Sequence, residues 1–324
     1  MSDRPPEATL WDCLRGALAT KALAAVVDAG VPEALADGPR PVAELGGRPE
    51  TMERLLRALA SDEIFLEEEP GVFGHTDASR LLLDRSWAAF AHLFGDVFYE
   101  AVADLAADVS PPTFDRRFGA DFWTWLRERP AERAIFDAAM GGSKEAKTQR
   151  LAELEWREGE VVADLGGGNG ALLLDLLERR PELRGIVFDL PETVRDEAIL
   201  GDRCSFVAGS FFDAVPPADA YVLSQILHDW SDEDATRILQ TIRAAAPPHA
   251  RLLIAESVIS PGNEPQGAKW LDLLMLAVGG RERTEDDWRG LLSAGGFEPV
   301  SIEDQLLQAR LARPMAVRGP EGTG

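Results

Sequence analysis

Residues 161–177 of this chain read VVADLGGGNGALLLDLL: an apolar run, a turn with four glycines and a leucine-rich stretch with helical spacing. An apolar run of this length is typical of a buried strand. Gly166, Gly168 and Gly170 permit a tight turn after the strand. They also let a ligand approach the backbone and the N-terminus of the following helix. A strand, a glycine turn and a helix in this order favour a nucleoside-binding α/β fold.

The same alternation continues toward the C-terminus. Short apolar runs predict strands at 161–165, 186–189, 205–207, 220–224 and 252–256, and helices fit at 170–180, 192–200, 232–246 and 284–294. Two helices start like capping boxes, at Ser231 with Asp234 and at Thr284 with Asp287. Strands that alternate with helices predict a doubly wound, Rossmann-like parallel sheet of the α/β class. The last runs, 299–302 and 315–317, suit an antiparallel pair at the sheet edge.

A chain of 324 residues favours two domains, because one hydrophobic core rarely grows beyond about 250–300 residues. Residues 10–36 have helical spacing, with Leu14, Leu18 and Ala22 on one face. A helix at 49–61 and a hairpin from 64–66 and 72–73 complete the order of a winged helix. We therefore expect a mostly α winged-helix domain at 1–100, a helical linker and pocket region at 101–150, the sheet domain at 151–318 and a frayed tail at 319–324.

Acidic residues outnumber basic ones by 56 to 33, and the net charge is −23. Residues 1–100 alone hold 18 acidic and 9 basic groups, a net of −9. Affinity for nucleic acid and for anionic membranes comes largely from Lys and Arg, so both kinds of partner are disfavoured.

Cysteine use and the N-terminus suggest a compartment. Cys13 and Cys204 form no CxxC pair or Cys/His cluster, which fits a reducing setting without a zinc site. The N-terminus has no apolar segment typical of a signal peptide, and no apolar run approaches the ~20 residues of a membrane span. We expect a cytoplasmic protein that uses no metal.

A carboxylate follows the glycine turn at the distance a nucleoside site needs. Asp189 ends the second predicted strand, where it can accept hydrogen bonds from both hydroxyls of a ribose. Gly166-x-Gly168-x-x-Ala171 fits a dinucleotide fingerprint of the weaker kind. It also fits the first motif of S-adenosylmethionine enzymes, in which a strand-end acid, here Asp164, can meet the cofactor's ammonium group. The glycines alone do not decide between the two cofactors.

Among the four histidines, His228 has the context of a catalytic residue. It follows the predicted strand that ends at Ser224, at the carboxyl edge where ligands bind such sheets. Glu256 ends the next strand and Glu282 precedes the Thr284 helix. Carboxylates beside an imidazole can fix its tautomer and raise its basicity. His75, His92 and His249 are better explained as packed or surface residues.

Several strings, in this order, carry a resemblance: VVADLGGGNG, IVFDLPETV, AGSFFDAVPPADAYVLSQILHDWSDEDATRIL, LLIAESVI and DLLMLAVGGRERT. They resemble the S-adenosylmethionine-dependent O-methyltransferases of the plant caffeate/flavonoid type and their bacterial natural-product relatives, including enzymes of antibiotic biosynthesis. The resemblance covers nearly the whole chain, and LHDW together with GGRERT is its most specific part. Region 10–85 is similar to that family's dimerisation domain, which implies a homodimer formed through the N-terminal domain.

The resemblance implies a role for individual residues. His228 would be the general base that removes the acceptor's hydroxyl proton, and Glu256 and Glu282 would flank and orient it. The family commonly has an acid where this chain has Ser210, which brings no charge to the adenine contact. The implied cofactor contacts are Asp164, Gly166, Gly168, Asp189, Ser210, Phe211, Ser224 and Arg133. The implied substrate-pocket residues, for which core packing is an equal alternative, are Phe136, Met140 and Met275.

Four functions are compatible with these features. The first is methyl transfer from S-adenosylmethionine to a hydroxyl of a small, aromatic secondary metabolite. The second is a same-fold natural-product enzyme that uses the cofactor otherwise: a hydroxylase, decarboxylase, cyclase, or C- or N-methyltransferase. Retention of His228 favours the first. The winged helix also allows a DNA-binding regulator, which the acidity of residues 1–100 disfavours, and an NAD-dependent enzyme is a remote fourth.

Overall fold

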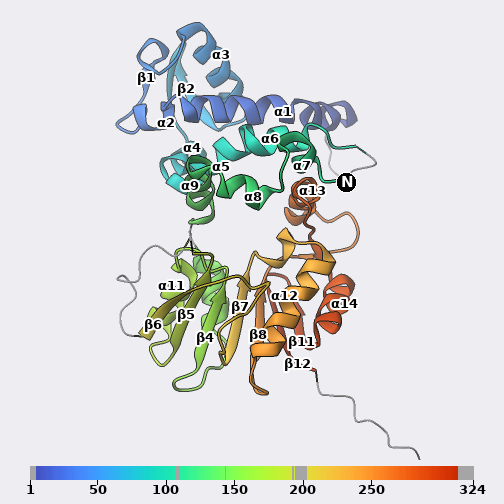
Figure 1. Cartoon of the computed structure of the whole chain (residues 1–324). Helices are drawn as coiled ribbons and strands as arrows, with labels where there is room; N and C mark the ends of the chain where they lie inside the picture. The colour runs from blue at the N-terminus through green and yellow to red at the C-terminus, as the bar shows by residue number, and fades with distance from the viewer. Residues whose placement is uncertain (1–4, 107–109, 143, 192, 194–202, 313–324) are drawn as a thin grey trace, which may run out of the picture. The chain divides into compact units, whose positions relative to one another are not determined.

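The computed structural model describes residues 5–106, 110–142, 144–191, 193 and 203–312. The chain divides into two compact units, Met1–Gly142 and Ser143–Gly324 (Figure 1). The domain boundaries that we expected near residues 100 and 150 stay predictions, and the expected tail at 319–324 lies outside the described residues. No helix in the described ranges is long and apolar enough to cross a membrane.

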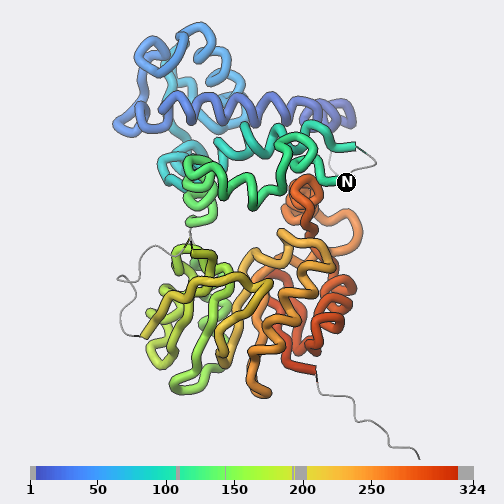
Figure 2. The backbone as a smooth tube through the Cα atoms, in the orientation of Figure 1, coloured from blue at the N-terminus to red at the C-terminus, as the bar shows by residue number. Residues whose placement is uncertain are grey.

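The N-terminal unit is mostly helical, with one small antiparallel sheet of order β1-β3-β2. Figure 2 shows α1 as one long, straight helix. The helix expected over 10–36 ends at Asp28, and Gly30, at a φ of +70°, separates it from a short helix. The first elements are α1 (Pro6–Asp28), α2 (Val31–Ala34), β1 (Arg40–Pro41), α3 (Pro49–Ala60), β2 (Phe65–Glu69), β3 (Val72–His75) and α4 (Asp77–Arg80). The later ones are α5 (Arg85–Gly95), α6 (Val97–Val102), α7 (Thr113–Phe118), α8 (Phe122–Arg127) and α9 (Pro130–Met140).

Helix α1 has one buried end and one exposed apolar stretch. Ala22 is buried with Val26, where it packs against the β2–β3 hairpin and α3. The first half instead exposes Leu10, Trp11, Leu14 and Leu18, each more than 60% exposed. Leu14 and Leu18 share a face with Ala22 in sequence, yet only Ala22 contributes to this unit's core.

The C-terminal unit contains a seven-stranded sheet of order β11-β12-β8-β7-β4-β5-β6. Five strands are parallel, as the alternation predicted: β4 (Val161–Leu165), β5 (Arg184–Asp189), β6 (Cys204–Ala208), β7 (Ala220–Ser224) and β8 (Arg251–Ala255). The helices are α10 (Glu145–Ala152), α11 (Ala171–Arg179), α12 (Asp232–Ala245), α13 (Ala268–Val278) and α14 (Glu285–Gly295). The helix expected at 192–200 lies almost wholly outside the described residues.

Both faces of the sheet are buried, and alternate residues of each strand point to opposite faces. Along β7, Tyr221 and Leu223 pack with α12 and α14, which lie together in Figure 1. Ala220 and Val222 pack on the other face against the leucines of α11. Burial on both faces explains the continuous apolar runs that the sequence shows.

The antiparallel end of the sheet corrects one prediction. Strand β11 (Phe297–Glu303) pairs with β12 (Leu306–Leu311), and β12 then pairs with β8. The expected second strand at 315–317 was wrong as the partner of this pair, and that segment lies outside the described residues. The true strand contains Gln308 and Arg310 among its apolar residues, so its apolar pattern is broken by long polar side chains.

Candidate active site

The predicted site residues gather at the carboxyl edge of the parallel strands. Asp164 lies near the end of β4, Asp189 ends β5, Ser224 ends β7, and Glu256 directly follows β8. Neighbouring parallel strands place their carboxyl ends at the same edge. Residues separated by about 90 positions in sequence therefore meet in one region of the C-terminal unit.

The glycine turn forms a tight cradle at this edge. Gly166, Gly168 and Gly170 have φ values of +73°, +59° and +79°, a backbone conformation that favours glycine. A Cβ atom at Gly166 would lie 2.4 Å from Cδ1 of Ile226. The Gly168 N–H donates to Asp189 Oδ2 at 2.8 Å, which fixes this carboxylate against the turn. This hydrogen bond between the turn and Asp189 could not be predicted from the sequence.

Asp164 is a buried carboxyl with an unused acceptor. The residue is 2% exposed, and its Oδ2 has no hydrogen-bond partner among the described residues. Burial, followed by the charge of Asp189, raises the pKa of Asp164 to about 7, although Lys144 and Lys147 oppose the shift. An unpartnered buried carboxylate beside a glycine turn suits a cationic group, such as the ammonium of S-adenosylmethionine.

His228 and Glu282 form a buried hydrogen-bonded pair. His228 lies in a 3-10 turn, Leu227–Asp229, and its Nδ1 is 2.7 Å from Glu282 Oε1. Both side chains are at least nine-tenths buried. Burial by itself lowers the pKa of His228. The charge of Asp229, the hydrogen bond to Glu282 and the charge of Glu256 outweigh burial and raise that pKa to about 9.

Glu256 has a different geometry from the flanking role that the resemblance implied. Its Oε1 accepts hydrogen bonds from the backbone N–H groups of Ile226 and Leu227, at 3.0 and 2.7 Å. Glu256 therefore holds the turn that carries His228, whereas Glu282 contacts the imidazole directly. Its second oxygen, Oε2, is buried and has no partner in the described part of the chain.

The GGRERT segment fixes the histidine turn from the other side. Arg283 is fully buried and donates to the carbonyl oxygens of Leu227 at 2.8 Å and Trp230 at 3.0 Å. The Arg281 N–H donates to the carbonyl of His228 at 2.8 Å. A Cβ at Gly280 would lie 2.1 Å from that same carbonyl oxygen. Both ends of the LHDW turn are thus determined by the segment that supplies Glu282.

Comparison with known proteins shows the family to which this chain belongs. The O-methyltransferase domain matches residues 97–298, and the O-methyltransferase dimerisation domain matches residues 11–85. The chain belongs to the O-methyltransferase family. This confirms the family that the LHDW and GGRERT strings predicted, together with its Rossmann-like fold, its N-terminal dimerisation domain and its cofactor, S-adenosylmethionine.

Relatives from natural-product pathways are similar over most of their length. The phenazine O-methyltransferase PhzM of Lysobacter antibioticus is 36% identical over 90% of this chain and 91% of that protein. The mitomycin biosynthesis 6-O-methyltransferase of Streptomyces lavendulae is 32% identical over 90% and 89%. The solved structure of CalO1, a methyltransferase in calicheamicin biosynthesis in its SAH-bound form, has a TM-score of 0.78 and 31% identity, covering 96% of this chain and all of CalO1.

Other predicted positions have contacts of their own in this O-methyltransferase. Ser210 Oγ accepts from the Phe212 N–H at 3.2 Å, so its hydroxyl already shapes the local turn. The Phe211 ring lies edge-on to Phe212 and Trp230. Met275 is buried within α13.

Three predicted positions lie on α9 in the N-terminal unit. Arg133 Nε is 2.6 Å from Asp137 Oδ1, and Phe136 packs edge-on against Phe122 and Trp123. Met140 is half-buried. For Phe136, packing among aromatic side chains accounts for its position within this unit.

Several residues in or beside the candidate site were not predicted from the sequence. Asp229 lies with its Oδ1 3.5 Å from His228 Nε2, and burial raises its pKa. Asp229 and Arg283 stand inside the LHDW and GGRERT strings, so the strings themselves were the available signal. Lys144 and Lys147 belong to no motif and could be found only from the structure.

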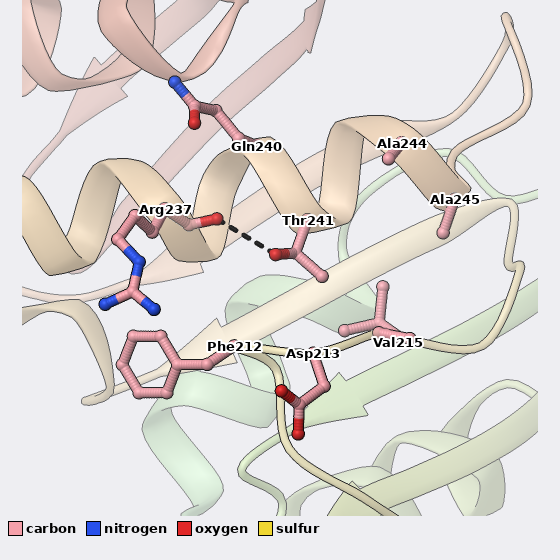
Figure 3. A pocket seen from close by; sticks show the side chains of 9 residues that line it. Phe212, Asp213, Val215, Arg237, Gln240, Thr241, Ala244 and Ala245 are labelled. Atoms are coloured by element: carbon pink, nitrogen blue, oxygen red, sulfur yellow. Dashed lines mark hydrogen bonds between the residues drawn. The ribbon is translucent and has the colours of Figure 1, made fainter.

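A separate hollow of about 500 Å³ lies between α12 and the loop before β7 (Figure 3). Phe212, Asp213 and Val215 line one side, and Arg237 and Thr241 line the other. None of the predicted site residues lines this hollow.

Proposed function

We propose that this chain transfers the methyl group of S-adenosylmethionine to a hydroxyl of a small aromatic acceptor, with His228 as the general base. The observation that carries the proposal is the buried 2.7 Å hydrogen bond between His228 and Glu282, together with the glycine turn and the buried Asp164, whose Oδ2 has no hydrogen-bond partner among the described residues. A histidine fixed by a carboxylate is the usual arrangement for taking a proton in a water-poor site.

The cofactor site consists of residues with complementary chemistry. Asp164 provides a carboxylate for the ammonium group, and Asp189 provides a carboxylate for the ribose. The turn at Gly166 lets the cofactor approach the backbone closely. When bound, S-adenosylmethionine supplies an activated sulfonium methyl. The protein has mainly to align the acceptor oxygen with that methyl, since alignment of two reactants supplies much of the rate.

The hydrogen bond between His228 Nδ1 and Glu282 determines that Nε2, which lies 3.5 Å from Asp229 Oδ1, is the nitrogen that can act as the base. If Nδ1 donates its proton to Glu282, Nε2 is the acceptor that takes the proton of the acceptor hydroxyl. With S-adenosylmethionine bound, the acceptor oxygen would form its bond to the methyl carbon as the carbon–sulfur bond breaks, and the bonding pair would stay on sulfur. The imidazole takes up the proton only in its neutral form, which positive charge in the cofactor site favours.

The aromatic class of the acceptor rests on two observations. PhzM of Lysobacter antibioticus is named for phenazine, a planar aromatic, and a further relative is named a 3-amino-4-hydroxybenzoate 4-O-methyltransferase. The predicted pocket helix α9 presents Phe136 among other aromatic rings. Rings of this kind stack well with planar acceptors.

We also propose that the chain acts as a homodimer in the cytoplasm. The dimerisation domain at residues 11–85 supports the dimer. The first half of α1 exposes Leu10, Trp11, Leu14 and Leu18, an apolar stretch of the kind that a partner covers. The cytoplasmic location rests on the cysteine usage alone.

A screen of phenolic acceptors with S-adenosylmethionine, read by mass spectrometry, tests the function. We expect at least one acceptor to gain a single CH₂ unit and to lose a titratable hydroxyl. Consumption of the cofactor with loss of CO₂, gain of oxygen or ring closure would instead identify the alternative, a same-fold enzyme with another reaction. A CH₂ gain on carbon or nitrogen, located by fragmentation, would contradict O-methylation specifically.

A further inference from the structure

Helix α10 brings two lysines to the carboxyl edge of the sheet. The chain has only four lysines, and Lys144 and Lys147 are one helical turn apart, Lys144 being the N-cap of α10. Both side chains are half-buried. Lys147 Nζ lies 3.4 Å from Ser224 Oγ, at the end of β7 and four residues before His228. A cation therefore lies at the end of β7, the strand that precedes the turn carrying the proposed base.

The charges around Lys147 are those of the proposed active site. Its neighbours are Glu256, Glu282 and Asp164, together with the like charge of Lys144. Burial is the largest influence and, with Lys144, lowers the pKa of Lys147 to about 8. Within the described ranges, Lys147 forms no ion pair within 4 Å with any of these carboxylates. Each of the three carboxylates keeps one buried oxygen that has no hydrogen-bond partner among the residues the structure describes.

This arrangement differs from a structural ion pair. A lysine kept only to neutralise buried acids would contact one of them, because the loss of water around an ammonium is costly unless an ion pair or hydrogen bonds replace it. The ammonium of Lys147 has three N–H donors, and its hydroxyl contact at 3.4 Å is long. Within the described part of the chain, at least two donors therefore remain for a group that enters the site.

We propose that Lys147, assisted by Ser224, is an oxyanion-binding residue that stabilises the ionised hydroxyl of the acceptor. The inference rests on the proposed function and adds a second electrostatic residue to it. His228 takes the proton from the hydroxyl, and the Lys147 ammonium stabilises the negative charge left on the oxygen until the C–O bond forms. Such preorganised charge acts most strongly in a water-poor site.

Two anionic oxygens could occupy this position, that of the acceptor and the carboxylate of the cofactor. The neighbouring charges favour the acceptor. Lys147 Nζ contacts Ser224 Oγ, four residues before His228, and its charged neighbours include Glu256 and Glu282, which hold and contact the base.

The test measures ionisation without turnover. 4-Nitrophenol, whose phenolate absorbs visible light, is titrated with pH in the complex of the enzyme with S-adenosylhomocysteine. We expect the wild-type complex to lower the pKa of the bound phenol and Lys147→Met to cut the phenolate fraction about tenfold at a fixed pH below that pKa. Lys147→Arg should retain much of the effect, and Lys269→Met, the same change at a lysine outside the site, should retain all of it.

The competing outcomes are distinct. Absence of a pKa change in the wild-type complex, or an equal change in Lys147→Met, would overturn the proposal. Calorimetry with S-adenosylhomocysteine and with 5′-methylthioadenosine, which lacks the carboxylate, tests the other source. If Lys147→Met weakens only the first ligand tenfold, Lys147 binds the cofactor carboxylate and the acceptor assignment is wrong. Failure of the proposed function shows separately, as absence of a CH₂ gain in the acceptor screen.

Discussion

Gly280→Ala tests how closely the GGRERT segment determines the position of His228. The Cβ of an alanine at this position would lie 2.1 Å from the carbonyl oxygen of His228 and 2.8 Å from the carbonyl carbon of Asp229. Both are backbone atoms, so no side chain can rotate away. Gly280 does not have a positive φ, and the effect of the substitution is therefore steric and not conformational.

The expected magnitude follows from the distance. Relief of a 2.1 Å contact to an ordinary separation needs a shift of roughly 1 Å in the His228 turn, and a misplacement of that size costs about 10²-fold in rate. This corresponds to about 2.7 kcal/mol of transition-state stabilisation. The same shift lengthens the hydrogen bond from the Arg281 N–H to the carbonyl of His228, now 2.8 Å.

The assay is kcat/KM for the acceptor that the mass screen identifies, with S-adenosylhomocysteine affinity as a check on the cofactor site. Gly290→Ala is the matched control, because that glycine lies in α14 and a Cβ there meets nothing within 4 Å. We expect the control to retain full activity. A folded Gly280→Ala protein with kcat/KM within threefold of the wild type would refute the reasoning.

Three further predictions concern charge and assembly. Glu282→Gln removes a carboxylate that raises the pKa of His228, so the acid limb of the pH–rate profile should move to lower pH while the plateau rate falls. An unmoved acid limb would show that Glu282 does not raise the pKa of the base. Asp164 has a pKa of about 7 and binds an ammonium only when ionised, so S-adenosylhomocysteine affinity should fall about tenfold for each pH unit below 7, and calorimetry on Asp164→Asn should show weak binding without that slope. Leu14→Glu with Leu18→Glu should give folded monomers by light scattering, because both side chains are more than 70% exposed and outside the core; an unchanged dimer would exclude this face.

The parallel part of the fold was predictable because its signals are local. The apolar run before Gly166 and the strand that ends at Ser224 are continuous in sequence, since both faces of these strands are buried. Strand β12 was not predictable in the same way, because Gln308 and Arg310 interrupt its pattern. Leu14 shares an apolar face with Ala22 in sequence but is exposed in the structure, because spacing shows that a face is apolar and not which surface covers it.

The site residues also divide into those that have a local sequence signal and those that have none. His228 and Glu282 stand in strings whose residue order is distinctive, so their pairing could be anticipated from the resemblance. The role of Glu256 could not, because its contacts are with backbone N–H groups, which any sequence supplies. Lys147 reaches Ser224 across 77 positions, a contact that depends on how α10 packs and leaves no trace in the local sequence.

The central claim is that His228 removes the acceptor proton, and the rate of methyl transfer by His228→Ala at saturating acceptor and cofactor tests it most directly. General base catalysis contributes roughly 10²–10⁴-fold, so we expect turnover to fall by that factor while S-adenosylhomocysteine affinity changes little. Turnover near the wild-type value across the pH range would contradict the account.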